Sequence, residues 1–294
     1  MSDMSINLKL KVKEVVTNSD FLSSIRRTFR YNKAKMHYKK MSKSYSESKL
    51  PLEISKFKNL HRGERCFVIG NGPSLTPEDL EKIKDEYTFA ANRIYLMFDK
   101  TEWRPTFYMC QDRQLMRTVK YYYSNCQETV LLNYPALYEY GIDVPNAYYY
   151  LADNRDAHRL VSKLGFSDEV DKYVVDGGSV TYSAIQMAAY MGFKEIYLLG
   201  VDHNFSHTLD KNRRVIEHKE VKEDYFDKRY KEAFKQFEEK GKTYAAPDKE
   251  LMDIAFEAAN NYCAVNGIKI CNATRGGKLE IFPRVDFDKL VNEM

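Results

Sequence analysis

Short apolar runs and amphipathic stretches alternate along this chain from residue 65 onward. Helical patterns separate most of the apolar runs, most clearly over residues 77–85, 180–191 and 249–265. Short apolar runs without strict alternation are typical of strands buried on both faces of a parallel sheet. The pattern therefore predicts an α/β fold built on a doubly wound, mostly parallel, Rossmann-like sheet. The predicted strands cover residues 65–70, 87–92, 105–110, 128–133, 172–176, 195–201 and 268–272.

The segment before this body has a different pattern. Residues 19–40 place apolar side chains at roughly helical spacing, with arginines and lysines mostly on the other side. Such a basic amphipathic helix lies on an anionic membrane surface, or it packs on the domain or on a second subunit. Residues 41–62 have the composition of a linker. We therefore expect a basic helical extension and linker over residues 1–62 and a catalytic domain over 63–294.

One highly charged stretch interrupts the alternation inside the body. Residues 206–248 lie between the sixth predicted strand and the last predicted helix, at the carboxyl end of a strand. An insertion at this place suits a helical lid or an acceptor-binding subdomain. A solvated helical hairpin without a chemical role fits the composition equally well.

Composition and charge narrow the classes of protein. The net charge of +4 comes from residues 1–50, which hold 12 Lys and Arg against 4 Asp and Glu and leave 34 against 38 in the rest. A mildly acidic body does not favour nucleic-acid binding. Five cysteines form no CxxC pair, so we expect reduced thiols. No apolar run is long enough for a membrane span, and no signal peptide is recognised. These features predict a cytoplasmic protein, either free or peripheral on the inner face of the membrane.

Small and amide residues follow four of the predicted strands. They are the turn Gly70–Ser74, Asn92, the turn Gly177–Ser179, and the stretch Gly200–His203. Because ligands of parallel sheets bind beyond the carboxyl ends of the strands, we expect these four stretches to meet around one ligand.

The first of these turns has the sequence GNGPS. Gly70 and Gly72 allow close backbone approach and positive φ, Asn71 adds an amide, and Ser74 adds a hydroxyl. Exposed N–H groups in such a turn suit a phosphate. The spacing matches neither GxGxxG nor a Walker loop, and acids already occupy the first turn of the following helix. A purely structural tight turn is therefore the alternative.

The GGSVTYS segment that begins at residue 177 repeats this design. Gly178, Ser179 and Thr181 precede or begin an apolar helix. The hydroxyls either cap that helix or contact a phosphate or a sugar carboxylate, and the pattern leaves both open.

Polar residues at the ends of other apolar strands supply candidate chemistry. Asp202 and His203 follow the strand EIYLLG, where charged groups need partners. Asp112 either holds a ribose or sugar hydroxyl or caps a loop. His203 and His207 are natural bases for deprotonating a hydroxyl. No HExxH or GxSxG motif is present, and no DxD pair is of the sort that holds the metal of a nucleotide sugar, so the sequence predicts no metal site.

Taken together, these motifs resemble one superfamily. GNGPSL after the first strand, Asn92, GGSV before a helix, GFKEIYLLGVDHNF and the closing NATRGGKLEIFPRVDF are similar to the MptE-like family, of the 6-hydroxymethylpterin pyrophosphokinase type. They also resemble the bacterial sialyltransferases of glycosyltransferase family 42. The resemblance covers about residues 64–285.

The resemblance implies a Rossmann-like, GT-A-variant-like domain with a nucleotide donor. It assigns phosphate and ribose contacts to Gly70, Asn71, Gly72 and Asn92, and it places Ser179–Thr181 at the matching Thr-Ser-Gly turn. The sialyltransferases require no metal cofactor. Their tyrosines beyond the GxD strand end are replaced here by His203-Asn204-Phe205, and their catalytic histidine is missing from residues 244–251. The base is therefore His203, His207 or Asp248.

Three functions are compatible with the sequence. The first is an inverting, metal-independent glycosyltransferase with a CMP-sugar-like donor and a glycan or lipid-linked glycan acceptor, acting in cell-surface polysaccharide synthesis. The second is a pterin-type pyrophosphokinase that uses ATP and Mg²⁺, with Asp112 and Asp202 as metal ligands. The third is a non-catalytic assembly protein with a nucleotide pocket. Whether the chain forms a homo-oligomer stays open.

Overall fold

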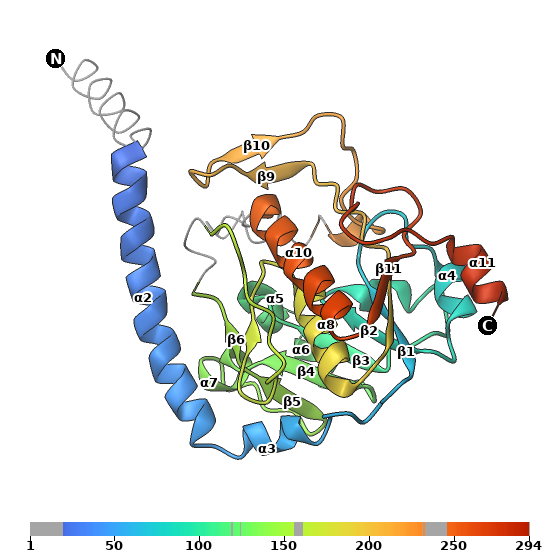
Figure 1. Ribbon diagram of the computed structural model, residues 1–294, viewed down its shortest axis with the longest axis horizontal. Helices are drawn as coiled ribbons and strands as arrows, with labels where there is room; N and C mark the ends of the chain where they lie inside the picture. The colour runs from blue at the N-terminus through green and yellow to red at the C-terminus, as the bar shows by residue number, and fades with distance from the viewer. Residues whose placement is uncertain are drawn as a thin grey trace.

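The computed structural model describes residues 20–118, 120–123, 125–155, 161–230, 232 and 246–293. Seven parallel strands form the central sheet, in the order β11-β8-β1-β2-β3-β4-β5. They are β1 (Arg65–Ile69), β2 (Tyr87–Ala91), β3 (Phe107–Cys110), β4 (Thr129–Asn133), β5 (Ala147–Tyr150), β8 (Glu195–Leu199) and β11 (Lys269–Asn272). The predicted α/β class with a mostly parallel, Rossmann-like sheet is confirmed (Figure 1).

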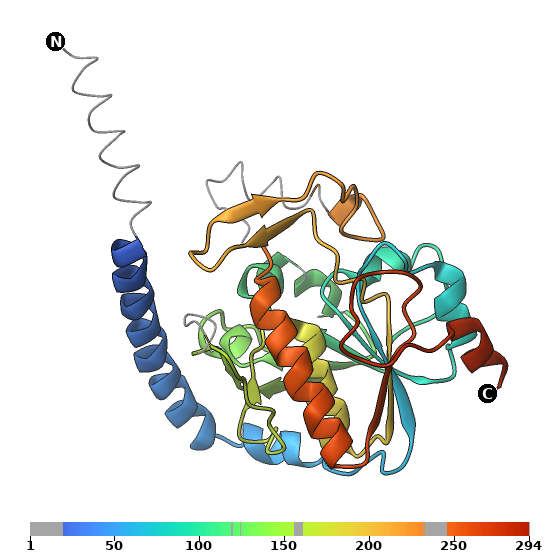
Figure 2. The same ribbon diagram turned by 45° about the horizontal axis from the view of Figure 1, so that its top comes forward.

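Helices cover both faces of this sheet. The helices are α2 (Asp20–Ser46), α3 (Leu50–Ser55), α4 (Pro77–Lys82), η1 (Ile94–Met97), α5 (Arg113–Thr118), α6 (Lys120–Tyr123), α7 (Pro135–Tyr138), α8 (Val180–Met191), α10 (Lys249–Val265) and α11 (Phe287–Asn292). Helices α8 and α10 lie side by side on one face (Figures 1 and 2). The predicted bounds of both are confirmed, because each has a capping side chain at its first turn.

Alternation along β1 divides the apolar interior into two layers. Cys66 and Val68 belong to the core under α8 and α10, whereas Phe67 and Ile69 belong to the core on the opposite face. Successive side chains of a strand point to opposite faces, so a fully buried strand contributes to both layers. The strand order also fixes a topological switch point, since the chain runs from β1 toward β5 and later returns to place β8 on the other side of β1.

One predicted strand lies outside the main sheet. Within residues 172–176 only Val174–Val175 is a strand, β7, and it pairs in parallel with β6 (Ala152–Asp153) in a separate two-stranded sheet. The edge position of the main sheet belongs to β5, in the tyrosine-rich stretch that the pattern did not predict. Tyr149 and Tyr150 are both buried there, so aromatic rings fill the role of aliphatic strand residues.

The predicted linker over residues 41–62 is wrong. Helix α2 continues to Ser46, and α3 follows after a short turn. Tyr38, Met41 and Tyr45 are buried in the core beneath the sheet. Buried large side chains at helical spacing make this segment part of the folded body, and the serines and lysines that suggested a linker occupy mostly its outer face. Ser19, at the start of the predicted helix, lies outside the described residues.

The first part of the insertion differs from the helices that its charge suggested, and its role as a lid stays a prediction. Its first part forms an antiparallel ribbon of β9 (His207–Leu209) and β10 (Val215–Glu217). Thr208 and Ile216 pair across the ribbon, which indicates that β-branched residues outweigh the charged ones in choosing the local structure. Residues 231 and 233–245 lie outside the described part.

Candidate functional site

A cavity of about 480 Å³ opens beyond the carboxyl ends of the central strands. It lies at the switch point between β1 and β8, where open α/β sheets bind ligands. The predicted nucleotide-binding residues that line it are Gly70, Asn71, Gly72, Asn92, Asp112, Gly178, Ser179, Thr181 and Asp202. Ser74 is not among the lining residues. The four strand-end stretches therefore meet, as the sequence analysis expected.

The GNGPS turn requires its glycines for a different reason from the expected positive φ. Neither Gly70 nor Gly72 has a positive φ. A Cβ on Gly70 would lie 2.2 Å from the carbonyl oxygen of Gly200, and one on Gly72 would lie 1.8 Å from Oδ2 of Asp202. These glycines are required because the turn packs directly against the end of β8. The space that they leave is filled by protein.

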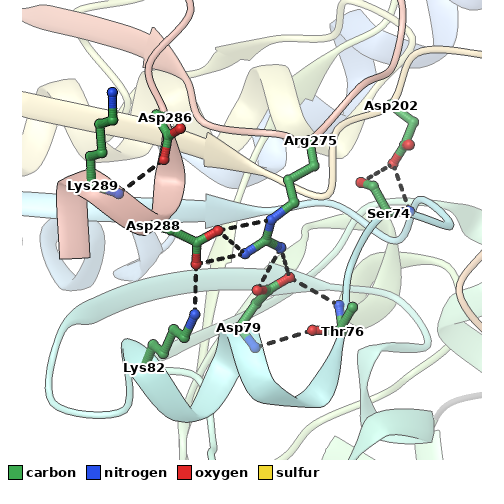
Figure 3. Close-up of polar contacts among 9 residues, drawn as sticks. All are labelled: Ser74, Thr76, Asp79, Lys82, Asp202, Arg275, Asp286, Asp288 and Lys289. Carbon is green, nitrogen blue, oxygen red and sulfur yellow. Dashed lines mark hydrogen bonds and ion pairs between the residues drawn. The ribbon is translucent and has the colours of Figure 1, made fainter. Parts of the chain in front are cut away.

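Asp202 and Ser74 hold the two strand ends together. The Ser74 hydroxyl donates to Oδ2 of Asp202 at 2.7 Å, as Figure 3 shows. Burial raises the pKa of Asp202 above its ordinary value, although the bonds from Ser74 oppose this. Ser74 is thus a structural partner of Asp202, which corrects the prediction that its hydroxyl faces the ligand.

The helix after the GNGPS turn begins with a closed cap. Thr76 and Asp79 form a capping box, in which each side chain accepts from the other residue's backbone N–H. Arg275 then donates to both carboxylate oxygens of Asp79, at 2.6 and 2.7 Å, and also contacts Asp288 of α11 (Figure 3). The Asp79 side chain is only 2% exposed. The first turn of α4 is therefore satisfied by the protein itself.

The turn before α8 is open by contrast. The Ser179 side chain accepts from the Thr181 backbone N–H, so the capping alternative holds for this hydroxyl. No acid lies in the first turn, and the N–H groups of Ser179 and Val180 have no partner within the described residues. Gly178 has φ +75°, which only glycine adopts readily. Because the turn lines the cavity, the positive end of a 12-residue helix faces the ligand space.

Amide side chains also line the cavity. Asn71 donates its Nδ2 to the carbonyl of Ala91, which leaves its buried Oδ1 without a partner in the described chain. The buried Oδ1 of Asn92 is also unpartnered there, and Asn92 has φ +59°. Asn133 is oriented in the opposite sense, since its Oδ1 accepts from the Ala152 N–H. Carboxamide oxygens accept only from donors, so Asn71 suits a ligand hydroxyl or amino group and not a phosphate oxygen.

Gln111 is another amide of the cavity wall. Its Oε1 accepts from the hydroxyls of Ser183 at 2.5 Å and Tyr150 at 3.2 Å. Since the oxygen is fixed, the amide nitrogen remains as a donor at the cavity wall.

His203, Asp253 and Lys249 form a chain of polar contacts at the same wall. The Nε2 of His203 lies 2.5 Å from Oδ1 of Asp253, and the other oxygen of Asp253 lies 2.7 Å from Nζ of Lys249. The buried Nδ1 has no partner in the described residues, and the backbone has φ +52°. Burial lowers the pKa of His203 below its ordinary value, although Asp253 opposes this. The neutral ring donates Nε2–H to the carboxylate, so Nδ1 carries the lone pair of a base.

The other two candidate bases have different surroundings. Asp248 lines the cavity, but it caps α10 and pairs with Arg213 at 3.2 Å. His207 is exposed on β9 beside Ser206 and does not line the cavity. Of the three candidate bases, His203 therefore combines a cavity position with an unpaired acceptor.

Five aspartates line the cavity, and each accepts a hydrogen bond from the chain. They are Asp112, Asp176, Asp202, Asp224 and Asp248. Asp112 caps α5 through the N–H groups of Gln114 and Leu115, in agreement with the capping alternative. Burial, together with Asp153, raises the pKa of Asp176. Within the described residues, no group of three or more His, Cys, Asp or Glu is arranged to hold a metal.

Part of the insertion forms a fixed wall of the cavity. Tyr225 and Tyr230 line it and stack with ring centroids 3.9 Å apart. The Phe226 N–H donates to the Asn71 carbonyl, and Arg229 pairs with Asp227 and with Asp99 near η1.

Several of the functional candidates missed by the sequence analysis lie at or just after strand ends: Gln111, Asn133 and Asp176. The strand-end rule would have found these three, but no sequence signal marks Asp253 in the middle of a helix.

Comparisons with solved structures give two similar folds. The MAf glycosyltransferase from Magnetospirillum magneticum AMB-1 is 16% identical with a TM-score of 0.44, over 82% of this chain and 38% of its own. This chain thus spans well under half of that protein. The sialyltransferase CstII from Campylobacter jejuni, determined in complex with a substrate analogue, cytidine-5'-monophosphate, is 16% identical with a TM-score of 0.46, over 76% of this chain and 85% of its own.

Comparisons of sequence identify the family. No curated protein sequence matches this chain significantly. The family described as 6-hydroxymethylpterin diphosphokinase MptE-like matches residues 36–208, which is more than half of the chain. The match begins inside α2, in agreement with the packing of that helix on the body. The chain belongs to the 6-hydroxymethylpterin diphosphokinase MptE-like family.

Proposed function

We propose that this chain is a glycosyltransferase that uses a nucleotide-activated sugar and inverts the anomeric carbon. The open first turn of α8, which contains no acid and faces the polar cavity, carries this proposal. The N–H groups of Ser179 and Val180 bind the donor phosphate and stabilise the charge that develops as the nucleotide leaves. Arg113 and Arg213 also line the cavity, paired with Glu139 and Asp248 respectively.

The amides around the cavity bind the nucleoside part of the donor. The unpaired Oδ1 atoms of Asn71 and Asn92 accept from ribose hydroxyls or from an exocyclic amino group, as in cytosine. The amide nitrogens of Gln111 and Asn133 donate to carbonyl or carboxylate oxygens. A CMP-sugar satisfies both requirements.

His203 is the proposed base. Its Nδ1 removes the proton from the acceptor hydroxyl, and the oxygen attacks the anomeric carbon as the bond from that carbon to the phosphate oxygen breaks. Asp253 holds the ring through Nε2 and stabilises the protonated form. Because Nδ1 has no exposed surface, an acceptor reaches it only after neighbouring side chains rearrange. Phe205 and Phe256 are the aromatic rings that contact His203.

The family description and the five lining aspartates favour a second candidate, a Mg²⁺-dependent pyrophosphokinase that uses ATP. Asp112 and Asp202 would then hold the metal. Both already accept hydrogen bonds from backbone or hydroxyl donors, so metal binding would have to replace some of these bonds.

A thermal-shift screen followed by turnover assays separates the candidates. CMP, UDP, GDP and CDP, their sugar conjugates, and ATP with Mg²⁺ are each added to the full chain. A ligand present at 100 times its Kd stabilises the native state by about 2.7 kcal/mol, so a binder is readily detected. Stabilisation by CMP and hydrolysis of a CMP-sugar support the proposal. Stabilisation by ATP with Mg²⁺ alone supports the kinase, and binding without turnover of any conjugate supports a non-catalytic role.

Variants of the proposed base test the mechanism. His203→Gln should lower kcat about 100-fold or more while the Kd of CMP stays within about twofold. His207→Gln is the matched control and should leave kcat unchanged, because His207 lies outside the cavity. Loss of activity in the control with retention in His203→Gln would contradict the assignment of the base.

A further inference from the structure

Helix α2 presents an exposed apolar stripe that nothing in the described chain covers. Ile25, Phe29 and Met36 are 49%, 69% and 64% exposed. At 100° per residue, these three side chains fall within about 40° of one another around the helix, so they form one face. Within the described residues, the buried side of the helix is formed by other side chains, namely Tyr38, Met41 and Tyr45.

Lysines flank this apolar face on both sides. Lys33 and Lys40 lie within about 80° of it in one direction, and Lys35 and Lys39 lie within about 100° in the other. All four are exposed. The whole helix carries eight Lys and Arg, while its only acid is Asp20 at the first residue. An apolar stripe between rows of lysines, without acids, is complementary to an anionic lipid surface.

Exposed apolar side chains also occur on the β9–β10 ribbon, but they do not share one face. Val215 and Ile216 of β10 are 58% and 45% exposed. The β9–β10 ribbon and the N-terminal half of α2 point toward the same end in both views (Figures 1 and 2). The ribbon also carries Arg213, which lines the cavity. Successive side chains of a strand point to opposite faces, so Val215 and Ile216 do not form one apolar face, and the continuous apolar face is that of α2.

We infer that the exposed face of α2 docks on a bilayer containing anionic lipids. The apolar side chains of α2 enter the interface, and the lysines of α2 meet the headgroups. No helix in the described part is long and apolar enough to cross a membrane. A second copy of the chain is a poorer occupant, because two such faces would bring one row of lysines against another.

Flotation of the full chain with vesicles tests this inference. Phosphatidylcholine vesicles are compared with vesicles in which about one third of the lipid is phosphatidylglycerol. Lys33→Glu with Lys40→Glu should lower the partition coefficient on anionic vesicles at least about 25-fold, since each basic residue contributes about fivefold. Lys84→Glu with Lys289→Glu makes the same charge change elsewhere on the surface and should have a much smaller effect.

The apolar contribution is tested separately. Phe29→Ser should lower the partition coefficient about tenfold, whereas Leu60→Ser, at a 58% exposed position elsewhere, should not. Equal binding to neutral and anionic vesicles would overturn the inference, and so would absence of binding to both. A Phe29→Ser variant that halves the mass in solution without changing vesicle binding would assign the stripe to a second copy. No nucleotide is present, so these results are independent of the proposed activity.

Discussion

Two turns of this chain join a strand to a helix through glycines and hydroxyls, and their surroundings are opposite. The GNGPS turn after β1 packs its glycines against Gly200 and Asp202, and Arg275 closes the helix that follows. The GGSV turn before α8 has no acid in its first turn and faces the cavity. Similar sequences thus serve packing in one place and suit ligand binding in the other.

The difference shows what a glycine-rich turn requires before it binds an anion. Free N–H groups at a helix start attract a phosphate only where the protein does not already satisfy them. Asp79 supplies that partner at α4, and no side chain does so for Ser179 and Val180 at α8. The following predictions test this contrast, from the largest expected effect to the smallest.

Replacing Gly70 should damage the fold more than replacing Gly178. Gly70→Ala places a Cβ 2.2 Å from a backbone oxygen that cannot rotate away, and overpacking of this kind costs about 3 kcal/mol of unfolding free energy. Gly178→Ala meets the side chains of Leu251 at 3.3 Å and Met252 at 3.6 Å, but it must hold φ +75°, which costs about 1 kcal/mol. Urea unfolding measures both. Equal losses would show that the GNGPS turn is not tightly packed.

Removing Arg275 should destabilise the first turn of α4. Arg275→Gln leaves the buried Asp79 carboxylate with only its capping-box bonds and should cost about 2 kcal/mol, less than for a fully buried pair because Arg275 is 41% exposed. Lys56→Gln, which loses an exposed partner of Glu53, should cost well under about 1 kcal/mol. Chemical unfolding of both variants measures the difference, and equal costs would contradict the role of the Asp79 pair.

Removing the capping hydroxyls of Thr76 and Ser179 should lower stability in both cases but weaken nucleotide binding in only one. Thr76→Ala and Ser179→Ala each remove a helix cap and should cost about 1 kcal/mol of unfolding free energy. Only Ser179→Ala should also weaken the nucleotide that the chain binds, because only its turn lines the cavity. Titration calorimetry gives the Kd of each. Equal weakening by Thr76→Ala would contradict the contrast between the turns.

The pH dependence of stability should have opposite signs for His203 and for Asp202. The pKa of His203 is lowered by burial, so its contribution to stability is lost as pH falls below the ordinary value of 6.5, where the unfolded chain takes up the proton. The pKa of Asp202 is raised, so the folded chain takes up the proton first. Its contribution is therefore gained as pH falls through the raised pKa toward 3.8.

Unfolding of two variants across this range separates the contributions. His203→Gln should remove the loss below pH 6.5, and Asp202→Asn should remove the gain at lower pH. If His203→Gln leaves the acid side of the profile unchanged, the histidine is not neutral in the folded chain.

Much of the fold was predictable because local pattern and global structure agree. The apolar runs at residues 65–70 and 195–201 are buried on both faces, and α8 and α10 carry their own caps. The predictions that failed depended on context. The serine- and lysine-rich stretch after residue 40 folds because Met41 and Tyr45 find apolar partners far away in the sequence, including Tyr134.

The sequence by itself determined the parallel sheet, the strand ends that carry polar side chains, and the basic character of α2. These features follow from periodicity and from residue type, which act over a few residues. Only the tertiary structure decided which glycine turn is closed, which histidine has a free acceptor, and which face of α2 is exposed. Asp79 meets Arg275, and His203 meets Asp253, across long separations in the chain. The partner that satisfies or frees a polar group is chosen by packing, and periodicity contains no information about it.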